Sequence, residues 1–341
     1  MGKIVLFGEL MLRLKPYGKE RFFQSPGFNA VFGGSEANVA VSLSKFQKES
    51  VFVTALPDNP LGEGAVSSLR YYGVDVRPVR KEGRLGLYFL ETGACQRPSH
   101  VIYDRENSVF SLAKPDEYDW ESIFEGATWL HISGVTPAIS ENTALCAKRA
   151  FEEAKKRGIS VSLDLNYRKK LWKWGKSASE VMRELSSYAD VLIANEEDVQ
   201  NCLGIPLENK STPSESYKAL CKSVKNQFPE VKYVAVTFRT SYSADRNGWS
   251  GFLDGQKGFY ESARYDIDTI VERVGAGDAF AAGLICALSE GCKTSEEEAY
   301  ALDFAAAAGC LKHSIPGDFN LSTRGEVESL VKGNAGGRIQ R

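Results

Sequence analysis

The chain has 341 residues, of which 43% are hydrophobic and 25% are charged, and its formal net charge is −2. This is the composition of a globular protein with one large domain or two ordinary ones. It excludes a global basic field that would favour nucleic acid or acidic membranes, and no apolar run approaches the roughly 18 residues of a membrane-spanning helix.

The N-terminus and the cysteines indicate a reducing compartment. The first 16 residues lack the long apolar stretch and the small-residue cleavage site of a signal peptide. The seven cysteines are scattered and form no CxxC pair, which disfavours a disulfide framework or a zinc site. The three histidines have no metal-binding spacing. We therefore expect a cytoplasmic protein without a histidine-based metal centre.

Short β-branched runs alternate with segments of helical length along most of the chain. The runs that predict buried strands are 3–7, 51–55, 129–132, 160–164, 191–194 and 233–237, and two of the helical segments are 36–46 and 141–157. This alternation predicts an α/β fold, in which helices cover both faces of a parallel sheet. In such folds ligands bind beyond the carboxyl ends of the strands.

Two segments, 10–33 and 84–113, break this alternation. They contain short alternating strands rich in glycine, tyrosine, phenylalanine and arginine. We expect them to form a small β lid at the ligand-binding edge of the sheet. The sequence has no internal repeat and no low-complexity linker, so we expect a single domain over 1–341, with 333–341 as a loose tail.

The most informative motif is Gly275-Ala276-Gly277-Asp278, which opens onto small and apolar residues that predict a buried helix. A glycine turn at a helix N-terminus directs backbone N–H groups and the positive end of the helix dipole at one point, which suits phosphate. Gly275 and Gly277 allow a ligand to approach the backbone closely. Asp278 could then accept a proton from a substrate hydroxyl, as phosphoryl transfer requires. The alternative is that Asp278 only caps the helix.

Two familiar nucleotide-binding motifs are missing. The sequence has no GxxxxGK[ST] loop, and no GxGxxG follows the first predicted strand. A Walker-type nucleotide site is therefore excluded, and a nicotinamide dehydrogenase is disfavoured.

The glycine motif resembles that of the ribokinase-like (PfkB-type) carbohydrate kinases. The block Gly33-Gly34-Ser35-Glu36-Ala37-Asn38 resembles the glycine pair and asparagine with which this family contacts its sugar. Within the family the chain is most similar to the 2-keto-3-deoxygluconate kinases, and the matching segments are 8–9, 96–99, 103–105, 164–168, 195–198, 243–250, 271–278 and 312–320.

This resemblance implies a three-layer α/β/α fold with a mostly parallel central sheet and a small β lid. It also implies ATP-dependent phosphorylation of the terminal hydroxyl of a six-carbon keto acid in the presence of Mg²⁺. The substrate would contact Gly33, Gly34 and Asn38, and the N–H groups of Ala276, Gly277 and Asp278 would hold the developing charge.

Arginines and tyrosines near the expected lid suit an acidic sugar. A guanidinium fork matches a carboxylate, so Arg105 and Arg168 are candidate substrate contacts, although Arg168 could instead reach the transferring phosphate. Tyr88 and Tyr103 would provide an apolar wall and two hydroxyls. The alternative is that both arginines are ordinary surface residues.

The nucleotide side of the site is less regular. The resemblance assigns Asn195 to the nucleotide and Asp198 to magnesium through water, with Glu197 left open as the carboxylate that orders the metal's waters. The usual glycine-rich turn after strand 233–237 is missing, although Thr237 and Arg239 could still reach the phosphates. His313 is a candidate nucleotide contact or a structural side chain.

Several questions stay open at this point. A kinase of a neutral sugar such as fructose or ribose, or a non-catalytic nucleotide- or sugar-binding regulator, could use the same fold. Gluconate- and galactonate-derived keto acids are not distinguished, and a monovalent cation could be required. Because an exposed sheet edge invites pairing, we expect a homo-oligomer that forms through the lid.

Overall fold

The computed structural model describes residues 2–334. Its central sheet has ten strands, and in spatial order all neighbouring strands from β5 to β11 run parallel. Their spatial order is β13 (Phe259–Glu261), β12 (Asn247–Asp254), β11 (Tyr233–Ser241), β10 (Val191–Ala194), β9 (Ser160–Asp164), β8 (Ala127–Ser133), β1 (Lys3–Phe7), β4 (Ser50–Pro57) and β5 (Asp75–Lys81). The edge strands β12 and β13 are antiparallel, and β14 (Tyr265–Ile267) also pairs with β12.

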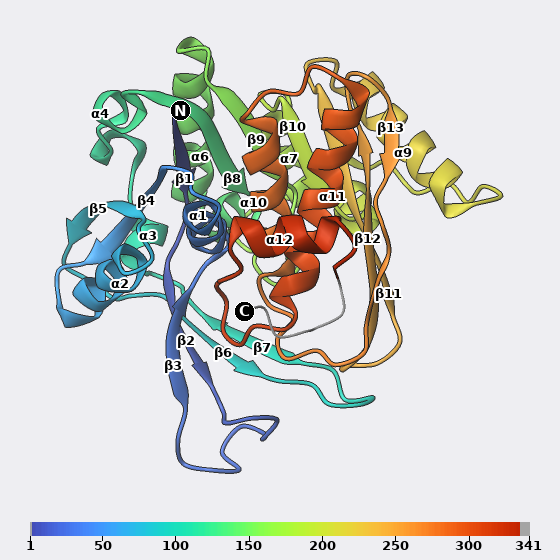
Figure 1. Ribbon diagram of the computed structural model, residues 1–341. Helices are drawn as coiled ribbons and strands as arrows, with labels where there is room; N and C mark the ends of the chain where they lie inside the picture. The colour runs from blue at the N-terminus through green and yellow to red at the C-terminus, as the bar shows by residue number, and fades with distance from the viewer. Residues whose placement is uncertain (1, 335–341) are drawn as a thin grey trace.

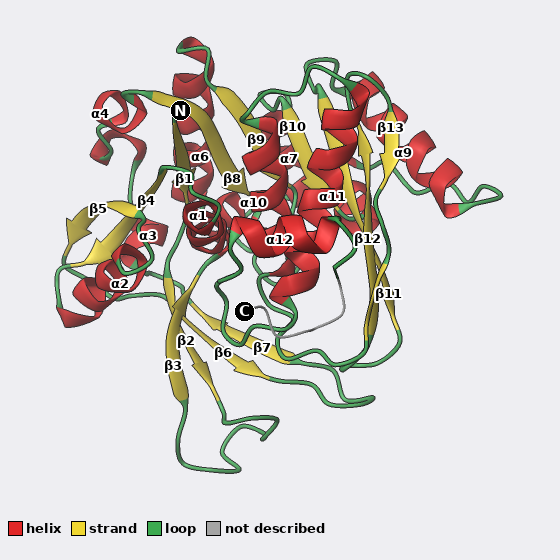
Figure 2. Ribbon diagram, viewed as in Figure 1, coloured by secondary structure: helices red, strands yellow, loops and turns green. Residues whose placement is uncertain are grey.

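Helices cover both faces of this sheet, as Figures 1 and 2 show. One face packs against α3 (Val109–Leu112), α4 (Trp120–Phe124), α6 (Glu141–Lys156), α7 (Ala178–Ser186), α8 (Glu196–Leu203) and α9 (Pro213–Gln227). The other packs against α1 (Ser35–Lys45), α2 (Pro60–Arg70), α10 (Ala276–Leu288), α11 (Ser295–Lys312) and α12 (Arg324–Val331). The short helices η1 (Pro115–Glu117) and α5 (Val135–Ile139) lie in the connections.

The predicted α/β architecture is confirmed, and all six predicted strands are present. The reason is visible in β4, where every residue of SVFVTALP is buried. A parallel strand that is covered on both faces has a continuous apolar run instead of an alternating one. The first helix prediction is displaced by one residue, because α1 covers Ser35–Lys45, and the second begins correctly but is one residue too long, because α6 covers Glu141–Lys156.

A second, four-stranded sheet lies below the central one in Figure 1. Its order is β3 (Asn29–Gly33), β2 (Met11–Lys15), β6 (Leu87–Glu91) and β7 (His100–Asp104). These strands fall within the two segments expected to form a lid. The C-terminal part of the second segment differs, because Val109 and Phe110 belong to the short helix α3 and are buried in the main core. Burial of these two apolar side chains in the core is more favourable than their exposure at the edge of the small sheet would be.

The end of the chain is only partly described. Gly333 and Asn334, which we expected in a loose tail, donate backbone hydrogen bonds to Leu330 and Ser329 and so close α12. Gly333 has a φ of 85°, the left-handed conformation common just after a helix. The rest of the predicted tail, residues 335–341, lies outside the described residues. Within residues 2–334, no helix combines the length and apolarity needed to span a membrane.

Candidate active site

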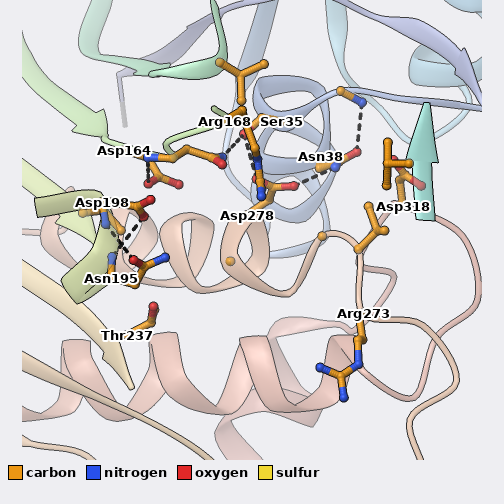
Figure 3. Close-up of a pocket in the computed structure, with 18 of the residues that line it drawn as sticks. Ser35, Asn38, Asp164, Arg168, Asn195, Asp198, Thr237, Arg273, Asp278 and Asp318 are labelled. Carbon is orange, nitrogen blue, oxygen red and sulfur yellow. Dashed lines mark hydrogen bonds between the residues drawn. The ribbon is translucent and has the colours of Figure 1, made fainter. Parts of the chain in front are cut away.

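A pocket lies where the carboxyl ends of β9, β10 and β11 meet the N-terminus of α10 and the inner face of the small sheet (Figure 3). Its volume is about 360 Å³. This is the edge at which parallel sheets bind ligands. Most predicted site residues line it, namely Gly34, Asn38, Tyr88, Tyr103, Arg105, Arg168, Asn195, Asp198, Thr237, Arg239, Gly275, Gly277 and Asp278.

Asp278 is held at the centre of the pocket by two side chains of α1. Ser35 Oγ donates a hydrogen bond to Asp278 Oδ1 at 2.8 Å, and Asn38 Nδ2 donates one to Oδ2 at 2.7 Å. Burial raises the pKa of the Asp278 carboxyl, and these hydrogen bonds oppose that rise. Asn38 therefore orients Asp278 in addition to lining the pocket.

The glycine turn before α10 has two distinct geometries. Gly275 has a φ of 85°, and a Cβ there would lie 2.2 Å from the carbonyl oxygen of Asp318. Gly277 faces open space, with no atom within 4 Å of the position of a Cβ. Since α10 begins at Ala276, the N–H groups of Ala276, Gly277 and Asp278 have no helical carbonyl to bond. They are available to an anion in the pocket.

Two further carboxylates lie near Asp278. Asp164 ends β9, and Asp198 lies in the first turn of α8, where it accepts hydrogen bonds from the backbone N–H of Tyr167 at 2.9 Å and Asn195 at 3.1 Å. Burial raises the pKa of Asp198 to about 6 despite these bonds. Burial also raises the pKa of Asp164 well above its usual value, and Asp198 and Asp278 add to that rise.

This gathering of carboxylates suits a hydrated divalent cation. Among residues 2–334, no group of three or more His, Cys, Asp or Glu side chains could hold a metal ion by itself. Magnesium often keeps several waters and binds through one or two carboxylates together with substrate phosphates. Asp198 and Asp164 fit that pattern, because a nearby cation would offset both the burial of Asp164 and its repulsion by Asp198, which together raise its pKa.

Three arginines line the pocket without a carboxylate partner among the described residues. They are Arg168, Arg239 and Arg273. Loss of hydration, together with the charges of Arg273 and Arg168, lowers the pKa of Arg239 to about 10. The Arg239 guanidinium lies over the Trp249 ring, 5.4 Å from its centroid. Arg168 and Arg239 are exposed and Arg273 is half-buried, and cations that repel one another across a pocket favour an anionic ligand between them.

Arg105 occupies the opposite side of the pocket and is only 4% exposed. Its Nε donates to Glu9 Oε2 at 2.7 Å, and its Nη2 pairs with the same oxygen. Its Nη1 is buried and has no hydrogen-bond partner among residues 2–334. The alternative of a surface arginine is therefore wrong for this residue, and one edge of its fork is left for a ligand.

The small sheet is tied to the main body at two places. Arg13 of β2 pairs with Asp318 at 2.6 Å and with Glu272 at 3.2 Å. Near the tip of the sheet, Cys95 N donates to Asp245 Oδ2 at 2.8 Å, and Ala244 N donates to the Cys95 carbonyl at 2.7 Å. These contacts connect the small sheet to the turn before α10 and to the β11–β12 loop.

Three predicted residues do not line the pocket. His313 is fully buried, where its Nδ1 bonds the Gly309 carbonyl and its ring packs against Trp249, an arrangement that favours the alternative of a structural side chain. Ala276 is buried at the start of α10, and only its backbone N–H points to the anion site. Gly33 lies against Asp318, whose Oδ2 would be 2.1 Å from a Cβ there.

Sequence reasoning missed other pocket residues, chiefly Asp164, Arg273 and Asp318. Tyr88 donates a hydrogen bond from its hydroxyl to Asp318 Oδ2, so this carboxylate joins the small sheet to the pocket. Signals for all three existed. Asp164 ends a predicted strand, Arg273 directly precedes the glycine motif, and Asp318 lies in the C-terminal segment of the resemblance.

Comparisons with known proteins indicate the family of this chain. The model of the pfkB family carbohydrate kinases matches residues 1–320. A crystal structure of 2-dehydro-3-deoxygluconokinase from Thermotoga maritima superposes with a TM-score of 0.90 at 43% identity, over 97% of this chain and 100% of that one. A 2-dehydro-3-deoxygalactonokinase of Haloferax volcanii is 32% identical, over 98% of both chains. A 2-dehydro-3-deoxygluconokinase of Thermoproteus tenax is 27% identical, over 97% of this chain and 95% of the relative.

These matches extend over nearly the whole chain and include the segments that build the pocket. The chain belongs to the pfkB family of carbohydrate kinases.

Proposed function

We propose that this carbohydrate kinase transfers the γ-phosphoryl group of ATP to the terminal hydroxyl of 2-keto-3-deoxygluconate and so forms the 6-phosphate, in the catabolism of sugar acids. The observation that carries the proposal is the position of Asp278, whose carboxylate is fixed by Ser35 and Asn38 beside the free N–H groups of α10. A base and an anion site in contact are what phosphoryl transfer to a hydroxyl needs.

The chemistry follows from this arrangement. Asp278 accepts the proton of the terminal hydroxyl as that oxygen attacks the γ-phosphorus, and the bond to the bridging oxygen of ADP breaks. The raised pKa of the buried carboxyl makes it a better proton acceptor. The N–H groups of Ala276, Gly277 and Asp278 stabilise the charge on the transferring group.

The acidic end of the substrate would bind on the lid side of the pocket. Arg105 is buried, its Nε and Nη2 are fixed by Glu9, and its unpartnered Nη1 remains available. A substrate carboxylate would satisfy that donor, and leaving a buried charged donor unsatisfied is unfavourable. Tyr103, whose ring lies 5.7 Å from the Arg105 guanidinium carbon, would complete the wall with Tyr88.

ATP would lie along the ends of β10 and β11. Asn195 and Thr237 line this side, and Arg239, Arg273 and Arg168 provide cations for the phosphates. Asp198, with Asp164 behind it, would hold Mg²⁺ through water. When bound, this ion would neutralise phosphate charge.

We infer further that the four-stranded sheet works as a lid within a single kinase domain. Its contacts at Arg13 and Cys95 support this role, since they would hold it over the pocket, exclude water and limit wasteful ATP hydrolysis.

The lid also offers a surface for self-association. Arg13, Tyr88 and Tyr103 are paired in register and face inward, so the next row, Leu14, Phe89 and Ile102, lies on the outer face. This outer row is apolar, and Ile102 is 46% exposed. We propose that a second copy of the chain covers it, because apolar sheet surfaces of this kind favour pairing.

We place the enzyme in the cytoplasm. Its seven cysteines are free thiols, as expected in a reducing compartment.

The decisive experiment measures ADP release with ATP and Mg²⁺ for 2-keto-3-deoxygluconate, its galactonate-derived epimer, fructose and ribose. We expect a strong preference for the keto acids, and Asp278→Asn should lower turnover by roughly 10²–10⁴-fold while both substrates still bind. Turnover only with neutral sugars would overturn the substrate assignment. Turnover with neither class would favour a binding regulator, and an unchanged Asp278→Asn enzyme would exclude Asp278 as the base.

A further inference from the structure

Lys312, the last residue of α11, is a fully buried lysine directly beneath the glycine turn. A Cβ placed on Gly275 would lie 3.2 Å from Lys312 Cε. The ammonium donates a hydrogen bond to the carbonyl oxygen of Ile315 at 2.9 Å. Lys312 thus connects the turn that follows α11 to the turn that begins α10.

The burial of this ammonium is unfavourable by itself. No carboxylate lies within 4.0 Å of Lys312 Nζ among the described residues. Burial lowers the pKa of Lys312 to about 8, while Glu272, Asp318 and Asp278 favour its charged form and Arg13 opposes it. Buried charges without a close partner are rare in proteins, and a methionine of similar length would fill the same space at less cost.

The Lys312 ammonium lies between the C-terminal end of α11 and the glycine turn that begins α10. The C-terminal end of α11 presents carbonyl oxygens, and because Lys312 packs against Gly275, this negative end lies next to the proposed anion site. An ammonium placed there offsets that negative end and adds to the positive N-terminus of α10. It also holds the turn at 315–318, whose Asp318 carbonyl packs closely against Gly275.

We propose that Lys312 is a positioning residue for phosphoryl transfer, a built-in cation that fixes the glycine turn and makes an added monovalent cation unnecessary. The inference rests on the kinase function proposed above. A lysine that merely capped α11 would be replaceable without a specific effect on turnover, and this difference is measurable.

The first arm uses the unmodified enzyme. Turnover of 2-keto-3-deoxygluconate with ATP and Mg²⁺ is first measured in a buffer whose monovalent cation is tetramethylammonium, an ion too bulky to enter the site. The measurement is then repeated with added K⁺, Na⁺ or NH₄⁺. We expect full turnover without the small cations and no gain when they are added. Turnover that depends on a small cation would overturn this inference and leave the function intact. Inactivity in every salt would instead refute the proposed substrate.

The second arm compares variants. Lys312→Met should lower kcat by about 10²-fold, as expected when a preorganised anion site loses its support, and NH₄⁺, methylammonium or K⁺ should restore part of it. Lys312→Arg, which keeps the charge, should lose less. The matched control is Lys156→Met, since Lys156 is also the last residue of a helix but is exposed.

Thermal unfolding shows whether each variant is folded. A folded Lys312→Met enzyme with normal turnover would overturn the proposal, and so would a loss of turnover that no small cation restores. If Lys312→Met does not fold, the cation dependence of the unmodified enzyme decides the question.

Discussion

Replacement of Gly277 by alanine should slow turnover without destabilising the fold. Gly277 lies in the first turn of α10 and is not among the residues with positive φ, so alanine can adopt its backbone conformation. No atom lies within 4 Å of the new Cβ, because that direction is the open pocket. The methyl group would therefore meet only the bound phosphate.

The expected magnitudes have opposite signs for stability and activity. Alanine in place of glycine within a helix stabilises by up to about 1 kcal/mol, and less near a helix end. A methyl group on the floor of the anion site displaces the phosphate by roughly 1 Å, and such a misplacement can lower kcat/KM by about 10²-fold. Gly277→Ala should thus unfold at the same temperature as the parent protein or slightly above it, with much lower activity.

Gly275→Ala is the matched control. Its φ of 85° disfavours alanine by about 1–2 kcal/mol, and its Cβ would lie 2.2 Å from the Asp318 carbonyl, so backbone must move. This variant should lose stability and activity together. The assays are thermal unfolding and steady-state ADP release. A Gly277→Ala enzyme with parental kcat/KM would refute the view that phosphate binds against this turn.

Three further predictions test other parts of the site. Arg105→Met should raise KM for the keto acid by about 10²-fold and leave KM for ATP unchanged, because Nη1 has no other partner; an equal rise for both substrates would contradict its role. Glu36, which accepts hydrogen bonds from Ser133 and Thr136, has a pKa raised by burial to about 7, so its contribution to stability is lost as pH rises through 7. Relative to Glu36→Gln, the parent protein should lose unfolding free energy between pH 5 and pH 8 in denaturant titrations. The same dependence of unfolding free energy on pH in both proteins would refute this. Ile102→Glu should shift the mass measured by light scattering toward the monomer, whereas the same mass would place the subunit contact elsewhere.

The sequence by itself determined the layout of the molecule. Strand positions followed from apolar runs because a parallel strand covered on both faces must be apolar throughout, as in β4. The same strand–helix alternation predicted that the site lies at the carboxyl edge of the sheet. The glycine motif located the proposed anion site, since a helix N-terminus attracts phosphate.

The contacts that aim each side chain were decided only by the tertiary structure. Asn38 and Asp278 are 240 residues apart, yet their hydrogen bond orients the proposed base. Arg105 gains its free Nη1 only because Glu9, 96 positions away, holds the rest of its fork. His313, by contrast, turns into the core against Trp249. Local pattern fixes which face an element buries, but partners so distant in sequence are set by how the layers pack, which no local pattern records.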